Sequence, residues 1–99
     1  MITKTYNFKA KLWLWEGKGA WHFLTLPERE SAEIKEIYGV FTTGWGSVPV
    51  TVTIGKSVWK TSIFPSKKEK AYLLPIKGEI RKNEKLQVSE VVEYSLEIK

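Results

Sequence analysis

The 99-residue chain contains no cysteine and no aspartate, and His22 is its only histidine. Without cysteine, a disulfide scaffold, a thiolate zinc site and a cysteine nucleophile are excluded. A lone histidine without cysteine or aspartate is also a poor ligand set, so we expect no metal site and no cofactor. No stretch is apolar for the length that a membrane helix needs, and residues 1–8 lack the apolar run of a signal peptide. We therefore expect a cytoplasmic protein that does not associate with a membrane.

The sequence offers no set of side chains that is typical of an active site. A catalytic triad would need His22 beside a hydroxyl such as that of Ser62, with a glutamate to orient it, and no spacing selects these partners. The eleven glutamates fall mostly at outward strand positions, in the helix or in loops, whereas glycosidases need two carboxylates that face each other. We interpret His22 as a strand residue held by packing and a hydrogen bond. We expect a protein that is not an enzyme and has no catalytic residues.

Length and composition favour a single β-rich domain spanning residues 1–99. A chain of this length supports one packed core, and Trp, Tyr, Phe, Val and Ile, which suit a half-buried sheet, dominate its hydrophobic residues. The formal net charge of +5 raises the hypothesis of nucleic-acid binding, because clustered cations bind phosphates. However, only Arg29 and Arg81 are arginines, and most lysines lie near glutamates, as on a solvated surface.

Hydrophobic alternation is the main organising signal along the chain. Apolar residues at every second position predict half-buried strands, and Gly55-Lys56 predicts a two-residue type II′ hairpin between two of them. Pro49 lacks an N–H group, so its strand should lie at an edge or carry a bulge there. About six strands in so short a chain favour a small closed or partly open barrel, because an open sheet leaves long edges exposed. The predicted strands cover residues 6–14, 20–26, 48–54, 57–64, 72–81 and 92–98.

The periodicity changes between the second and third predicted strands. Ile34, Ile37 and Tyr38 recur at helical spacing before Gly39, and Ser31 is placed to act as the N-cap. This spacing predicts one short helix over residues 31–38. Because its apolar stripe is narrow, the helix should cover one open end or one face of the mainly β barrel.

Four ordered segments form a recognisable pattern: Gly19–Phe23 with Leu26-Pro27, Gly44–Val50, Trp59–Pro65 and Tyr72–Lys77. Together they resemble the bacterial family DUF1905 over nearly the whole chain. The resemblance implies a small β-barrel similar to the double-split barrels of AbrB-type regulators, and it implies no activity. Members usually carry Gly-Asp before the last strand, where this chain has Ser89-Glu90, and serine does not share the freedom of glycine at positive φ.

Trp13 and Trp15 are unexpected on their strand, because alternation places them beside Lys9 and Lys11 and opposite the inward residues. One explanation is structural: the helix or a loop covers this face, so that both faces of the strand are buried. The other is functional: the aromatic and basic strip stacks on bases or sugars, or forms a homodimer contact. Trp21, in contrast, is interpreted as a packing residue.

A second candidate site involves Lys60, Lys77 and Arg81. If these cations converge near a barrel mouth, they make an anion-binding pocket walled by Trp45 and Trp59. Alternation places Trp59 and Thr61 on one face of their strand and Lys60 on the other, and solvated lysines are the alternative interpretation.

The sequence therefore supports a non-catalytic binding or interaction module as the leading hypothesis. The ligand is expected to be small and anionic or planar, or the partner to be a protein. Nucleic-acid binding, by analogy with AbrB-like barrels, is the alternative, and an enzyme comes third because it needs a carboxylate beside His22 in a pocket.

Overall fold

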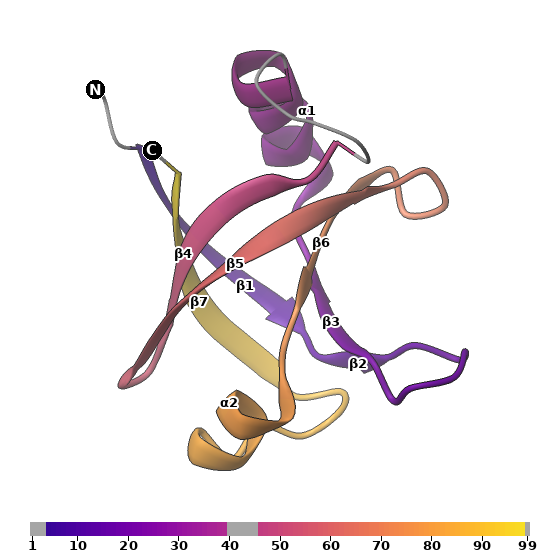
Figure 1. Cartoon of the computed structure of the whole chain (residues 1–99), viewed down its shortest axis with the longest axis vertical. Coiled ribbons are helices and arrows are strands. Elements are labelled where there is room, and N and C mark those ends of the chain that lie inside the picture. Colours follow the sequence, from indigo (N-terminus) through magenta and orange to yellow (C-terminus); the bar gives the residue numbers. More distant parts are fainter. Residues whose placement is uncertain (1–3, 40–45, 99) are drawn as a thin grey trace.

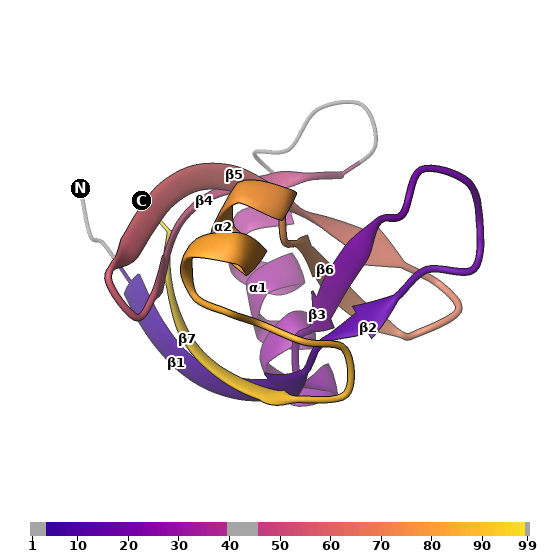
Figure 2. The same cartoon turned by 90° about the horizontal axis from the view of Figure 1, so that it is seen from below.

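The computed structural model describes residues 4–39 and 46–98, which form a curved antiparallel sheet with a helix at each end (Figure 1). The seven described strands follow the spatial order β1-β7-β4-β5-β6-β3-β2 and make a half-barrel. Seen from below, α2 lies across the near opening and α1 lies behind it (Figure 2). The elements are β1 Lys4–Lys11, β2 Trp13–Leu14, β3 His22–Thr25, α1 Glu28–Tyr38, β4 Val48–Ile54, β5 Ser57–Ser66, β6 Ala71–Pro75, α2 Gly78–Asn83 and β7 Val91–Ile98.

The core is built from the inward residues that alternation predicts. Alternate positions of β1, β4 and β7 are buried, and the residues between them face outward. Since the sheet curls, its inner faces meet and exclude water from one cluster. The inward residues of these three strands are Tyr6, Phe8, Val48, Val50, Val52, Ile54, Val92, Tyr94, Leu96 and Ile98.

The β4–β5 hairpin has the predicted register and turn. Ile54 pairs with Ser57, so Gly55 and Lys56 form a two-residue loop. Gly55 has a φ of 57°, whereas Lys56 is not among the described residues with positive φ, as a type II′ turn requires. Pro49 lies outside the segment of β4 that pairs with β7, which confirms the predicted edge position.

The predicted start of the first helix is wrong. The helix begins at Glu28, directly after Pro27, and Ser31 is a buried residue of its first turn. The Ser31 hydroxyl instead accepts a hydrogen bond of 3.0 Å from the Tyr72 N–H group. Ser31 therefore joins α1 to β6. The N-cap motif is misleading because the hydroxyl of a serine near a helix start can accept a hydrogen bond either from the N–H groups of the helix or from those of a neighbouring segment.

The prediction of a single helix and of a strand through residue 81 is also wrong, because residues 78–83 form α2. Ile80 is the buried residue of α2, and it falls in step with the buried even-numbered residues Leu74 and Ile76 before it, so the period of two continues into the helix. Alternation alone therefore cannot separate the two structures here. α2 is held to the hairpin by the Ser57 hydroxyl, which donates a 2.7 Å hydrogen bond to the Glu84 carboxylate just beyond the helix. None of the described helices is both long and apolar enough to cross a membrane.

The turn before β7 contains a strained serine. Ser89 has a φ of 74°, and its N–H group donates a 2.7 Å hydrogen bond to the carbonyl of Leu12. A backbone in the left-handed region of φ and ψ costs a non-glycine residue about 1–2 kcal/mol. This cost is slightly larger than the conformational entropy that a glycine at the same position would lose on folding.

We therefore expect Ser89→Gly to raise the free energy of unfolding by about 0.5 kcal/mol, measured by urea denaturation with an unchanged m-value. Ser95→Gly, the same change inside β7, should lower it by about 0.5–1 kcal/mol. A loss of stability in the Ser89→Gly variant would contradict the assignment of strain to this turn.

Candidate ligand-binding pocket

β5 and β6 are paired over only part of their lengths. Their ladder joins Phe64 to Leu73, Pro65 to Tyr72 and Ser66 to Ala71. β5 continues back to Ser57 without a partner on that side among the described strands, and the two ribbons diverge toward the end that carries α2 (Figure 1). The sheet is therefore split between these two strands.

Pro75 explains where the split begins. Continuing the register would place Ser62 opposite Pro75. The Ile76 N–H group donates a 2.9 Å hydrogen bond to the His22 carbonyl, so the main-chain groups of Ile76 face β3 and those of Pro75 face β5. Because proline has no N–H group, it cannot extend the ladder toward β5 at this point.

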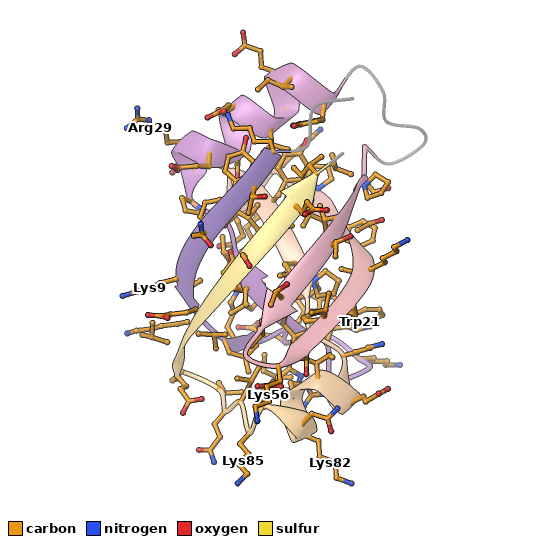
Figure 3. All side chains as sticks on the ribbon, turned by 90° about the vertical axis from the view of Figure 1, so that its left-hand side faces the viewer. Lys9, Trp21, Arg29, Lys56, Lys82 and Lys85 are labelled. Atoms are coloured by element: carbon orange, nitrogen blue, oxygen red, sulfur yellow. The ribbon has the colours of Figure 1, made fainter. Side chains whose placement is uncertain are left out.

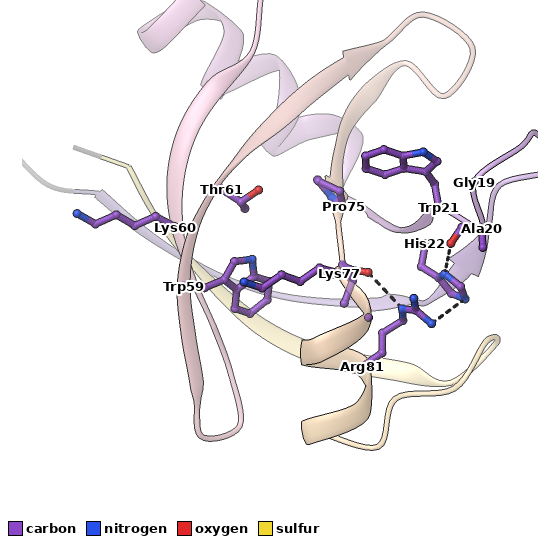
Figure 4. A pocket seen from close by; sticks show the side chains of 12 residues that line it. Gly19, Ala20, Trp21, His22, Trp59, Lys60, Thr61, Pro75, Lys77 and Arg81 are labelled. Atoms are coloured by element: carbon purple, nitrogen blue, oxygen red, sulfur yellow. Dashed lines mark hydrogen bonds between the residues drawn. The ribbon is translucent and has the colours of Figure 1, made fainter.

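The split opens into a cavity of about 320 Å³ between β5, β6, the start of α2 and the loop before β3 (Figure 4). Trp59 and Thr61 line it from β5, and Trp21 lines it from the loop on the opposite side. Pro75 lies between them, and Ile76 also lines the cavity (Figure 4). The cavity is thus an aromatic-walled site of the size that suits a small molecule.

The charged side chains at the pocket are cations. Lys77 extends toward the β5 side and Arg81 lies on the β3 side, whereas the side chain of Lys60 points away from the cavity (Figure 4). Of the three cations for which a convergence was predicted, the structure therefore brings Lys77 and Arg81 to one pocket and directs the Lys60 ammonium group away from it. Alternation explains this difference, since Lys60 is on the opposite face of β5 from Trp59. The described residues that line the pocket include no carboxylate.

The side chains of His22 and Arg81 contact each other at the edge of the pocket. The Nδ1 atom of His22 lies 2.8 Å from the Ala20 carbonyl, which can only accept, so Nδ1 carries the proton. The Nε2 atom lies 3.4 Å from the Arg81 guanidinium, which can only donate. The Arg81 Nε–H group also donates a 3.3 Å hydrogen bond to the Ile76 carbonyl. These contacts fix the guanidinium and leave further N–H donors for an anion.

The family model for DUF1905, a domain of unknown function, matches residues 8–96. The chain belongs to the DUF1905 family. A search of the curated proteins gave no match. In this DUF1905 domain, three of the segments that carry the resemblance contribute to the pocket, namely Gly19–Phe23, Trp59–Pro65 and Tyr72–Lys77.

The other tryptophans that the sequence singled out lie outside the pocket of this DUF1905 domain or outside the described residues. Trp13 is half-buried, its ring centroid lies 5.2 Å from that of Phe23, and its indole N–H group donates a 2.8 Å hydrogen bond to the Thr25 hydroxyl. Trp15 is 46% exposed, and its ring lies over Gly17, where a Cβ atom would be 2.1 Å from it. Trp45 lies outside the described residues. Trp13 therefore packs, and Trp15 covers a loop glycine.

Sequence reasoning missed Trp21, His22 and Thr61 as lining residues of the DUF1905 pocket. Trp21 was assigned to packing, but its indole is 52% exposed and stacks on Phe23 at a centroid distance of 6.2 Å. One signal was available, because Trp21 and His22 come shortly after the Gly17–Gly19 turn, separated from it only by Ala20, and functional side chains gather at such strand ends. No group of acidic or histidine side chains that suits a metal ion occurs within the described residues.

Proposed function

We propose that this domain is a non-catalytic binding module that holds a small, planar, anionic ligand in the pocket between β5 and β6. The observation that carries the proposal is the composition of one cavity: two indoles on opposite walls, two cations at its lower rim and no carboxylate among its described residues. Aromatic walls favour a planar ring, and an unopposed pair of cations favours an anion.

Further support comes from the charge around the pocket. Lys56, Lys82 and Lys85 lie at the end that carries α2, where they outnumber Glu79 and Glu84, while Lys9 and Arg29 lie on other parts of the surface (Figure 3). Cations near a pocket raise the local concentration of anions and speed their association. The same arrangement suits a polyanion, so the test must separate binding in the pocket from binding to this basic end.

We expect phenyl phosphate, an aromatic ring with an anionic group, to bind the domain, and Lys77→Gln to weaken binding by about five- to tenfold, as loss of a charge-assisted hydrogen bond implies. Lys82→Gln is the matched control, since it makes the same charge change inside α2, the helix that Lys77 directly precedes, at a residue that does not line the pocket. It should weaken binding less than about twofold. Isothermal titration calorimetry at low salt gives the three dissociation constants.

Two results would overturn the proposal. One is the absence of measurable binding by the wild-type protein. The other is an equal loss of affinity in the two variants, because this indicates that anions bind to the basic end as a whole. In that case a short oligonucleotide should bind with a steep dependence on salt, as nucleic-acid binding requires.

A further inference from the structure

One wall of the pocket is the main chain of β5. Lys60 lines the cavity although its side chain points away from it. The hairpin register explains this: in a two-residue hairpin, Ile54 and Ser57 exchange main-chain hydrogen bonds, and every second pair after them does so too. Trp59 and Thr61 therefore bond to β4, and the N–H and C=O groups of Lys60 face the split.

These two groups have no strand partner across the split. The register of β5 and β6, if continued, would place Lys60 opposite Lys77. The Lys77 carbonyl instead accepts hydrogen bonds of 3.1 Å from the N–H groups of Ile80 and Arg81 as α2 begins. Among residues 46–98, no main-chain hydrogen bond joins Lys60 to Lys77. The pocket wall thus presents a donor and an acceptor side by side, neither of them paired within the sheet.

A donor beside an acceptor is the pattern that the hydrogen-bonding edge of a nucleobase complements. The indole of Trp59 adjoins this edge on the same strand and offers a face for stacking, which all bases accept. Lys77 and Arg81 lie on the α2 side of the cavity, where they could bind the phosphate of a nucleotide. We propose that the pocket binds a mononucleotide, with its base against Trp59 and the main chain of Lys60 and its phosphate at Lys77 and Arg81.

This inference rests on the proposed function and narrows its ligand class. The size of the cavity favours one nucleotide over a strand, since about 320 Å³ is at the lower end of the range for sites that bind one small molecule. The base edge is the feature that distinguishes a nucleotide from any other planar anion. Phenyl phosphate has the ring and the phosphate but no such edge, so the two ligand classes can be compared directly.

The test is calorimetric titration of the wild-type protein with AMP, GMP, CMP, UMP, adenosine and phenyl phosphate. At least one mononucleotide should bind ten times more tightly than phenyl phosphate, and AMP more tightly than adenosine. If phenyl phosphate binds and Lys77→Gln weakens its binding as expected, but no mononucleotide binds more tightly than phenyl phosphate, the inference is overturned and the proposed function stands. If neither class binds, both are overturned.

Two separate measurements test the stacking of the base on Trp59 and the hydrogen bonding of the base edge to the main chain of Lys60. Trp59→Leu should weaken mononucleotide binding at least tenfold, Trp59→Phe should retain most of it, and Trp15→Leu, at an exposed tryptophan outside the pocket, should leave it unchanged. The Lys60 amide in the wild-type protein should show one of the largest NMR shift changes upon saturation. An unshifted Lys60 amide overturns the edge assignment, even if the Trp59→Leu variant is too unstable to titrate.

Discussion

Leu74→Ala is expected to lower the free energy of unfolding by about 2–5 kcal/mol, the usual range for deleting a fully buried leucine side chain. Leu74 has 0% exposure and pairs with Leu24 of β3, whose exposure is also 0%. It lies next to Pro75, where the ladder to β5 has already ended. At this point β6 is held by its ladder with β3 on one side and by close packing around Leu74 where hydrogen bonds to β5 are absent. For a domain whose total stability is about 5–15 kcal/mol, such a loss is large.

Leu14→Ala supplies the matched control, because it makes the same chemical change at a residue that is 47% exposed. Its cost should stay below about 1 kcal/mol. Urea denaturation followed by circular dichroism measures both variants, and the m-value should not change. Equal losses in the two variants would mean that β6 is not the tightly packed strand described above.

Alkaline pH is expected to destabilise the fold through Tyr94. Burial raises the pKa of Tyr94 far above its ordinary value near 10, its exposure is 3%, and its hydroxyl has no hydrogen-bond partner among the described residues. The unfolded chain ionises this phenol near pH 10, whereas the folded chain keeps it neutral. Its contribution to stability is therefore complete below pH 10 and is lost as the pH rises toward the folded-state pKa. The loss is about 1.4 kcal/mol per pH unit, or about 2–3 kcal/mol at pH 12.

Tyr94→Phe should remove this dependence. At neutral pH the variant should be as stable as the wild type or more stable by about 1 kcal/mol, because the substitution deletes an unpaired buried hydroxyl. Denaturation curves of the two proteins between pH 8 and 12 test this, and their difference cancels the contribution of lysine deprotonation, which both proteins share. Parallel curves would show that Tyr94 has a polar partner or access to water.

Most of the sheet could be predicted from the sequence, because its strands are half-buried and their apolar residues recur with a period of two. The hairpin at Gly55-Lys56 was predictable for a local reason, since a two-residue turn fixes the register on both sides. The family resemblance, which the family model confirms over residues 8–96, agrees with the small barrel that the number of strands already favoured. The second helix was not predictable from alternation, because its buried residue Ile80 falls in step with the buried even-numbered residues Leu74 and Ile76 that precede it.

The candidate site was only partly predictable, because it depends on how separate elements meet. Trp59, Lys77 and Arg81 could be singled out by residue type, but their convergence requires α2, which the sequence pattern concealed. The role of Pro75 also depends on its neighbours. In the sequence, a proline indicates only that a strand ends, and the structure is needed to show that β5 is the strand to which Pro75 cannot donate a hydrogen bond. The contribution of Lys60 comes from its main chain, to which its identity as a lysine gives no clue.

A single missing N–H group thus links the sequence to the proposed function. Pro75 ends the β5–β6 ladder, the freed edge and the start of α2 enclose a cavity, and the side chains around it are aromatic and cationic. The glycine-rich turn before β3 then places Trp21 and His22 on the remaining side.

NMR titration of the ¹⁵N-labelled domain with phenyl phosphate tests most directly whether this split is a binding site. Saturable shift changes should be largest at the amides around the cavity and small on the outer surface of β1 and β7, where Lys9 and Glu93 form an exposed ion pair. No shift changes, or changes centred on that outer surface, would contradict the account. The amides expected to shift most are those of His22, Lys60, Ile76, Lys77 and Arg81.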